Sequence, residues 1–166
     1  MPRSQSLLLF ALVALAGCDS ADGSEEVVAF DTVLQSNEAF APYDLAAFET
    51  FVLQRKADEA ALLSRFPLAA GEFPQIDYTA RSAIVLLVPG RTGTGVQVSI
   101  TSVVREDEAT DGAVGFRYHV RADVRGVEGG ATTYPATVVT TPKLKAVELG
   151  SGVEEVPLAV SVSESP

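Results

Sequence analysis

The longest period-two pattern in the chain lies between Val114 and Arg125, and it constrains the fold more than any other feature. Apolar and polar residues alternate there over six apolar positions, as in a strand that buries one face and wets the other. The apolar set is Val114, Phe116, Tyr118, Val120, Ala122 and Val124, and the polar set is Arg117, His119, Arg121, Asp123 and Arg125. Such a strand must bury its apolar face against another element.

Further strands are predicted on both sides of this one. Residues 82–88 are apolar on both faces, which indicates a central strand, and residues 96–105 begin with clean alternation. Asp111-Gly112 is a hairpin signal between this second strand and the one that starts at Val114. Glycine-rich segments at 90–95 and 126–131 predict two more turns.

The two ends of the domain also show strand patterns. Residues 27–34 predict a first strand, and residues 132–141 predict a late strand that Pro135 assigns to a sheet edge or a bulge. Residues 147–149 and 153–162 predict a last hairpin around 150–152.

A helical pattern occupies residues 45–66. The apolar stripe consists of Leu45, Phe48, Val52, Ala60, Leu63 and Phe66, at helical spacing. Asp44 is suited to cap the start and Pro67 to end the segment, which predicts one long helix or two short ones. The expected class is therefore α+β, with an N-terminal strand and one or two helices packed on an antiparallel β-meander or small sandwich.

The first 18 residues carry a secretory pattern that ends in a cysteine. Arg3 precedes an apolar run at 7–16, which is shorter than the ~20 residues that span a bilayer. Leu15-Ala16-Gly17-Cys18 is similar to the bacterial lipobox, in which the cysteine sulfur receives a diacylglyceryl group before cleavage. Cys18 is the only cysteine, so it has no disulfide partner. The sequence predicts a lipoprotein carrying two or three acyl chains on Cys18, enough for stable membrane anchoring.

The predicted organisation is a signal peptide at 1–17, a lipidated acidic tether at 18–26 and one domain at 27–166. Without the leader, 149 residues with 11 basic and 22 acidic side chains remain, a net charge of −11. Such an acidic chain repels nucleic-acid phosphates, so no nucleic-acid partner is expected. We expect a bacterial cell-envelope location in the outer membrane, on its periplasmic or surface face. Asp19 also resembles an inner-membrane retention signal, which leaves the choice of membrane open.

Part of the chain resembles a known family. Pro74-Gln75-Ile76-Asp77-Tyr78 precedes a buried strand, the glycine-rich turn 90–95 and an alternating strand follow, and Thr133-Tyr134-Pro135-Ala136-Thr137-Val138-Val139 comes later. Over residues 73–142 this order is similar to the PrcB-type protease-complex subunits, which are small bacterial lipoproteins. The sequence departs from that pattern at Val96, where the family often has an aromatic residue. The resemblance implies a non-catalytic subunit that binds and stabilises a partner, in that family a secreted protease.

Groupings typical of catalysis or metal binding are scarce. His119 is the only histidine, and no Gly-x-Ser-x-Gly elbow accompanies it, so a surface role is expected. The glycine-rich segment 90–95 lacks the helix and the Gly-Lys-Ser/Thr of a phosphate loop. The acidic stretch Glu106-Asp107-Glu108 with Asp111 lacks the spacing of a known calcium loop, which favours a solvated turn. We expect no catalytic residue, metal or cofactor.

An arginine stripe is the remaining candidate. Arg117, Arg121 and Arg125 share the wet face of one strand, and Arg105 is expected nearby on the preceding strand. Guanidinium groups suit carboxylates, so the stripe could dock an acidic partner or an anionic glycan; the alternative is pairing with carboxylates of the same domain. The leading hypothesis is a lipid-anchored, non-enzymatic envelope protein that binds and stabilises a protein partner. The alternative is a binding module for a glycan or a small molecule.

Overall fold

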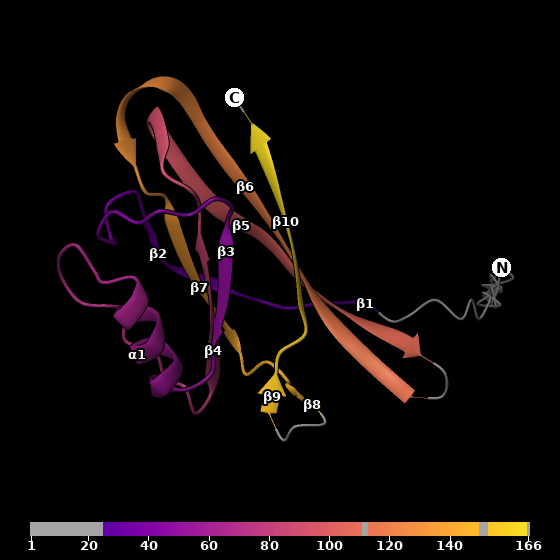
Figure 1. Cartoon of the computed structure of the whole chain (residues 1–166). Coiled ribbons are helices and arrows are strands. Elements are labelled where there is room, and N and C mark those ends of the chain that lie inside the picture. Colours follow the sequence, from indigo (N-terminus) through magenta and orange to yellow (C-terminus); the bar gives the residue numbers. More distant parts are fainter. Residues whose placement is uncertain (1–24, 111–112, 150–152, 166) are drawn as a thin grey trace, which may run out of the picture.

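The computed structural model describes residues 25–110, 113–149 and 153–165. The predicted signal peptide, Cys18, most of the tether, and the turns at 111–112 and 150–152 lie outside these residues. The elements are β1 (Glu25–Val27), β2 (Asp31–Ser36), β3 (Glu49–Leu53), α1 (Lys56–Arg65), β4 (Arg81–Leu87), β5 (Arg91–Thr110), β6 (Ala113–Thr133), β7 (Ala136–Pro142), β8 (Val147–Leu149), β9 (Val153–Glu155) and β10 (Leu158–Ser165) (Figure 1).

The described residues form a sandwich of two four-stranded sheets. The first sheet has the order β1-β5-β6-β10 and the second has the order β2-β7-β4-β3, with a small β8-β9 ribbon beside them (Figure 1). The described part of the chain is mostly β, with 59% strand and one short helix. The expected α+β class is thus confirmed in part: a small sandwich and a helix are present, but strands dominate.

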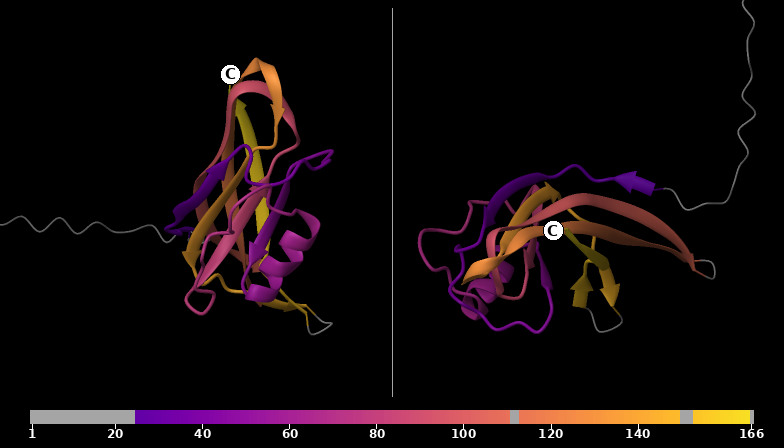
Figure 2. Two further views of the ribbon diagram at one scale, coloured as in Figure 1. Left: turned by 90° about the vertical axis from the view of Figure 1, so that its left-hand side faces the viewer. Right: turned by 90° about the horizontal axis from the view of Figure 1, so that it is seen from above.

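The second sheet is the middle layer, because apolar residues cover both of its faces. Ile84 and Leu86 of β4 pack toward the first sheet, whereas Val85 and Leu87 pack toward α1 and its flanking loops. All four side chains have 0% exposure, so the prediction of a central strand at 82–88 is confirmed. Figure 2 shows α1 on one side of this sheet and the long β5–β6 ribbon curving across the other.

The helix is much shorter than the pattern at 45–66 predicted. Residues 49–53 form β3, which pairs antiparallel with β4 from Glu49↔Leu87 to Leu53↔Ala83. Phe48 lies in the loop before β3 and Val52 lies within β3, so their spacing of four residues arises here without a helix and the periodicity was misleading. The helix begins where Asp58 accepts the backbone N–H groups of Gln54 and Arg55 at 2.9 Å, and not at Asp44.

The strands β5 and β6 form one long hairpin, and both glycine-rich segments lie within it. The turns predicted at 90–95 and 126–131 are wrong, because residues 91–95 belong to β5 and residues 126–131 belong to β6, and the two strands pair here from Arg91↔Thr133 to Thr94↔Val127 with a break in the register. Register irregularities accommodate them: Gly129 and Gly130 adopt φ of 112° and 98° opposite the step from Thr92 to Gly93. A bulge with positive φ bends a strand without ending it, which is how this ribbon curves.

The C-terminal strands differ from prediction in position and direction. Residues 136–142 form β7 between β2 and β4, so β7 is not the edge strand that Pro135 predicted. Pro135 lies just before β7, where its carbonyl accepts the N–H of Val88 at 3.1 Å. β8 and β9 form the expected ribbon, but β10 continues separately and runs parallel to β6 from Leu158↔Tyr118 to Ser165↔Arg125.

Candidate functional site

The outer face of the first sheet carries the predicted arginine stripe. Arg117, Arg121 and Arg125 are exposed on β6, whereas Tyr118, Val120, Ala122 and Val124 between them are buried. The alternation along β6 therefore assigned both faces correctly wherever its side chains are described.

Arg105 does not join this stripe, which corrects the expectation. An extra residue, Thr101, stands between the pairs Ile100↔Ala122 and Ser102↔Arg121, and it reverses the alternation of β5. Arg105 consequently lies on the inner side of the ribbon, with its guanidinium carbon 5.0 Å from the centre of the Phe116 ring. It also contacts Asp107 at 2.7 Å and Glu26 at 3.3 Å.

Carboxylates of the same domain pair with some of the predicted stripe arginines. Arg125 donates to Asp123, which also accepts hydrogen bonds from Ser163 and Ser165 of β10 at 3.3 and 3.1 Å. The hydrogen bond from Arg125, more than any other contact, holds the pKa of Asp123 below its usual range. Internal pairing, which was the alternative interpretation, therefore describes Arg125 and Arg105. Within the described residues, Arg121 has no such carboxylate partner.

His119 lies in the middle of the same face. Its Nε2 is 3.0 Å from Glu106 Oε2 on β5, and both side chains are partly exposed. Glu106 lies within β5 and not in the solvated turn predicted for the acidic stretch 106–108. A groove of about 420 Å³ runs over His119 and Arg121 toward Ser161 of β10.

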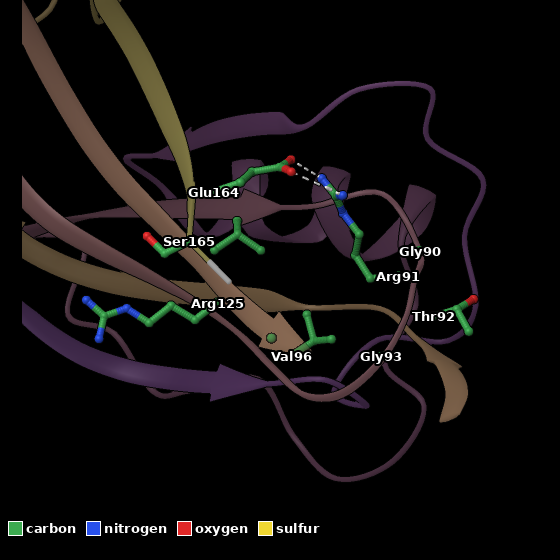
Figure 3. A pocket seen from close by; sticks show the side chains of 10 residues that line it. Gly90, Arg91, Thr92, Gly93, Val96, Arg125, Glu164 and Ser165 are labelled. Atoms are coloured by element: carbon green, nitrogen blue, oxygen red, sulfur yellow. Dashed lines mark hydrogen bonds and ion pairs between the residues drawn. The ribbon is translucent and has the colours of Figure 1, made fainter. Parts of the chain in front are cut away.

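The glycine-rich start of β5 forms one wall of a larger pocket. Gly90, Arg91 and Gly93 face β10, where Glu164 binds the Arg91 guanidinium (Figure 3). Arg125 and Ser165 complete the rim, and the pocket has a volume of about 610 Å³. A strand and not a helix follows the glycines, so the arrangement is not a phosphate loop.

A third concave surface lies at the open side of the sandwich, between the edge strands β3 and β10. One wall consists of Phe48, Thr50 and Val52, and the other of Leu158, Val160 and Val162. We call this surface the edge groove; its two parts have volumes of about 560 and 220 Å³ and meet at Phe48. Phe48 is 40% exposed, the most exposed phenylalanine in the described chain.

Sequence reasoning missed the edge groove because the wall that contains Phe48 was assigned to a helix. The signal that could have found it is residues 158–165, Leu-Ala-Val-Ser-Val-Ser-Glu-Ser, an alternating strand with a single charge. Such a strand lacks the charges and prolines that usually protect a sheet edge.

Across 25–110, 113–149 and 153–165, no three His, Cys, Asp or Glu side chains are grouped so that they could hold a metal ion. The described part of the chain also contains no helix with the length and apolarity needed to cross a bilayer.

No family model, curated protein or solved structure matches this chain. The similarity to PrcB-type subunits therefore stays a prediction from the motifs alone.

Proposed function

We propose that the chain is a lipid-anchored, non-catalytic envelope protein that binds and stabilises a protein partner. The motif Leu15–Cys18 supports the anchor, and the PrcB-like order of motifs over 73–142 suggests a secreted protease as the partner. The single observation that favours a protein partner is the edge groove, where two strand edges that pair with no other described strand flank a channel with both apolar and polar side chains on its walls. Unpaired strand edges are templates for pairing with another chain.

The anchor is tested with a Cys18→Ala variant of the full chain in its bacterial host. The wild-type chain is expected in the membrane fraction, and labelled palmitate is expected to be incorporated only when Cys18 is present. A variant that stays membrane-bound and labelled would exclude lipidation at this cysteine.

Partner binding is tested by photo-crosslinking in the native membrane. A photoreactive phenylalanine analogue replaces one exposed residue at a time, either Ala47 beside the edge groove or Arg121 on the outer face of the first sheet. A crosslinked protein at either position supports the proposed function. If neither position yields a protein adduct, the proposal fails.

A glycan or small-molecule module is the second candidate, and the pocket in Figure 3 is the observation that favours it. Its volume of about 610 Å³ is within the usual range of ligand sites, and Arg91, Arg125 and Glu164 supply charged groups. The test is a thermal-unfolding screen with acidic and neutral oligosaccharides. A ligand-induced rise in Tm that Arg91→Ala abolishes would favour this candidate.

A further inference from the structure

The outer edge of β10 is open for backbone hydrogen bonding. Tyr118 N–H donates to the Pro157 carbonyl at 2.8 Å, and the parallel register then runs without a shift from Leu158 to Ser165. Because alternate residues of a strand turn their backbone groups to opposite sides, the amides and carbonyls of Val160 and Val162 point away from β6. In the sheet order β1-β5-β6-β10, no described strand lies on that side.

The edge groove lies where the side chains of an added strand would point. Val160 and Val162 are half-buried against the sandwich core, and Phe48 and Val52 face them across the channel. Thr50 lies between Phe48 and Val52 on the same wall, and its Oγ1 is covered by protein and has no hydrogen-bond partner among the described residues.

The negative charge at one end of the groove indicates which type of segment could bind there. Glu154 and Glu155 line that end, and neither has an ion-pair partner in the described part of the chain. Arg55, the basic residue that lines this part of the groove, already pairs with Asp58 at 3.4 Å. Two uncompensated carboxylates favour a basic segment.

A second copy of this chain is a poor occupant. Without its leader the chain has a net charge of −11, which opposes self-association. A copy could offer the edge of β3 or of β10, but neither strand contains a lysine or arginine that could lie beside Glu154 and Glu155.

We propose that the free edge of β10 receives an extended, basic segment of a partner protein as a fifth strand of the first sheet. Alternate apolar side chains of that segment fill the edge groove, and its basic residues lie beside Glu154 and Glu155. This inference rests on the proposed function, because it specifies which surface binds the protein partner and what chemistry that partner presents.

The first test measures binding of designed peptides to the full chain in detergent by fluorescence anisotropy. One labelled peptide alternates valine and threonine and has two lysines at one end; a matched peptide has two glutamates instead. The basic peptide is expected to bind about tenfold more tightly at low salt. The Glu154→Gln/Glu155→Gln double variant should abolish that preference. Equal affinities of the two peptides for the unmodified chain would overturn the proposal.

Strand addition is separated from simple apolar contact by N-methylation of the peptide backbone. Methyl groups on the amides of one alternate set should abolish binding, because that set donates to β10, whereas methyl groups on the other set should be tolerated. If both sets are tolerated, the peptide does not add as a strand and the proposal fails.

The surface is checked with two matched substitutions. Phe48→Lys places a charge in the edge groove and should weaken binding of the basic peptide at least tenfold. Val33→Lys is the control, because Val33 is equally exposed, at 39% against 40%, and lies on β2 at the opposite edge of the same sheet. Both variants should keep the wild-type circular dichroism spectrum. An unchanged affinity of a folded Phe48→Lys variant would overturn the proposal.

Crosslinking in the native membrane then distinguishes this inference from the proposed function. An adduct at position 47 that mass spectrometry maps to a basic segment of another protein supports both. Adducts only at position 121 leave the proposed function standing and overturn the edge groove as its site. An adduct at 47 to a second copy overturns the proposed occupant, and no adduct at either position overturns both ideas.

Discussion

Arg125 donates a hydrogen bond from its guanidinium Nε to Asp123 Oδ2 at 2.5 Å, along the same face of β6. Ser163 and Ser165 donate to the other carboxylate oxygen, so this one side chain joins β6 to β10. The contact matters for function because β10 forms the edge at which we propose partner binding.

The Asp123 contact should make stability depend on pH. Its pKa is lowered in the folded state, so the ionised carboxylate stabilises the fold above the ordinary pKa, and this contribution is lost as the pH falls through the lowered value. The Asp123→Asn substitution removes this pH-dependent contribution to stability. The difference in free energy of unfolding between wild type and variant should therefore shrink as the pH falls below the ordinary pKa of an aspartate.

Denaturant unfolding at a series of pH values measures that difference. Asp77→Asn is the control, because Thr79 lowers the pKa of Asp77 by local hydrogen bonds remote from β10. A constant gap between wild type and Asp123→Asn over the whole series would contradict the assignment.

Arg105 is expected to matter for stability more than Arg121 does. Arg105 lies over the Phe116 ring and pairs with Asp107, and its side chain is only 20% exposed. Arg105→Ala should lower the free energy of unfolding by about 1–2 kcal/mol. Arg121→Ala, on the exposed face, should change it by no more than about 0.5 kcal/mol. Equal effects in urea unfolding would mean that Arg105 does not anchor the ribbon.

Gly126 should tolerate no side chain. A Cβ at this position would lie 2.9 Å from both the Cα and the Cγ2 of Val96, and the backbone atom cannot move aside easily. We expect Gly126→Ala to cost about 1–3 kcal/mol in thermal or chemical unfolding. Ser161→Ala, on exposed strand, is the comparison and should be nearly neutral; a neutral Gly126→Ala would show that the ribbon relaxes there.

The hydroxyl of Tyr78 should stabilise α1. It donates to Glu59 Oε2 at 3.0 Å, and Glu59 is a carboxylate with 4% exposure that also binds Lys56. Burial, helped by Glu59, raises the pKa of Tyr78, so the hydroxyl remains a donor at neutral and moderately alkaline pH. Tyr78→Phe should cost about 1–3 kcal/mol.

Tyr134→Phe serves as the matched control for this last variant. The Tyr134 ring packs edge-on against Tyr43, but its hydroxyl makes no hydrogen bond within the described chain. Its removal should change the free energy of unfolding by about 0.5 kcal/mol at most. If both substitutions cost the same, the Tyr78–Glu59 contact contributes nothing specific.

Local pattern was sufficient where one face, or both faces, of an element is buried over its whole length. The alternation around Val120 and the apolar run around Val85 predicted the correct strands and faces. The reason is that a buried strand face needs apolar residues, and this requirement is visible as a pattern in the sequence. It failed at residues 49–53, where pairing with β4, a partner some thirty residues on, overrides a helix-like spacing.

Three features had no adequate local signal. Glycines at 90–95 and 126–131 are compatible with either turns or bulges, and only the pairing of β5 with β6 decides between them. The bulge at Thr101, which moves Arg105 to the other face, depends on register. The parallel pairing of β10 with β6 depends on how β7, β8 and β9 return the chain, so the edge groove could not be predicted either.

If Cys18 is lipidated as proposed, the start of β1 limits how far this protein can lie from the lipid surface. Glu25 pairs with Glu106 on β5, only seven residues after Cys18. Seven residues span at most about 25 Å even when fully extended. With acyl chains on Cys18, the part of the β5–β6 ribbon around Glu106 would stay close to the lipid headgroups, and the rest of the domain could change its orientation relative to the membrane. Any partner captured along β10 would then be held within roughly one domain's height of the bilayer, which favours partners that are themselves membrane-associated or newly exported.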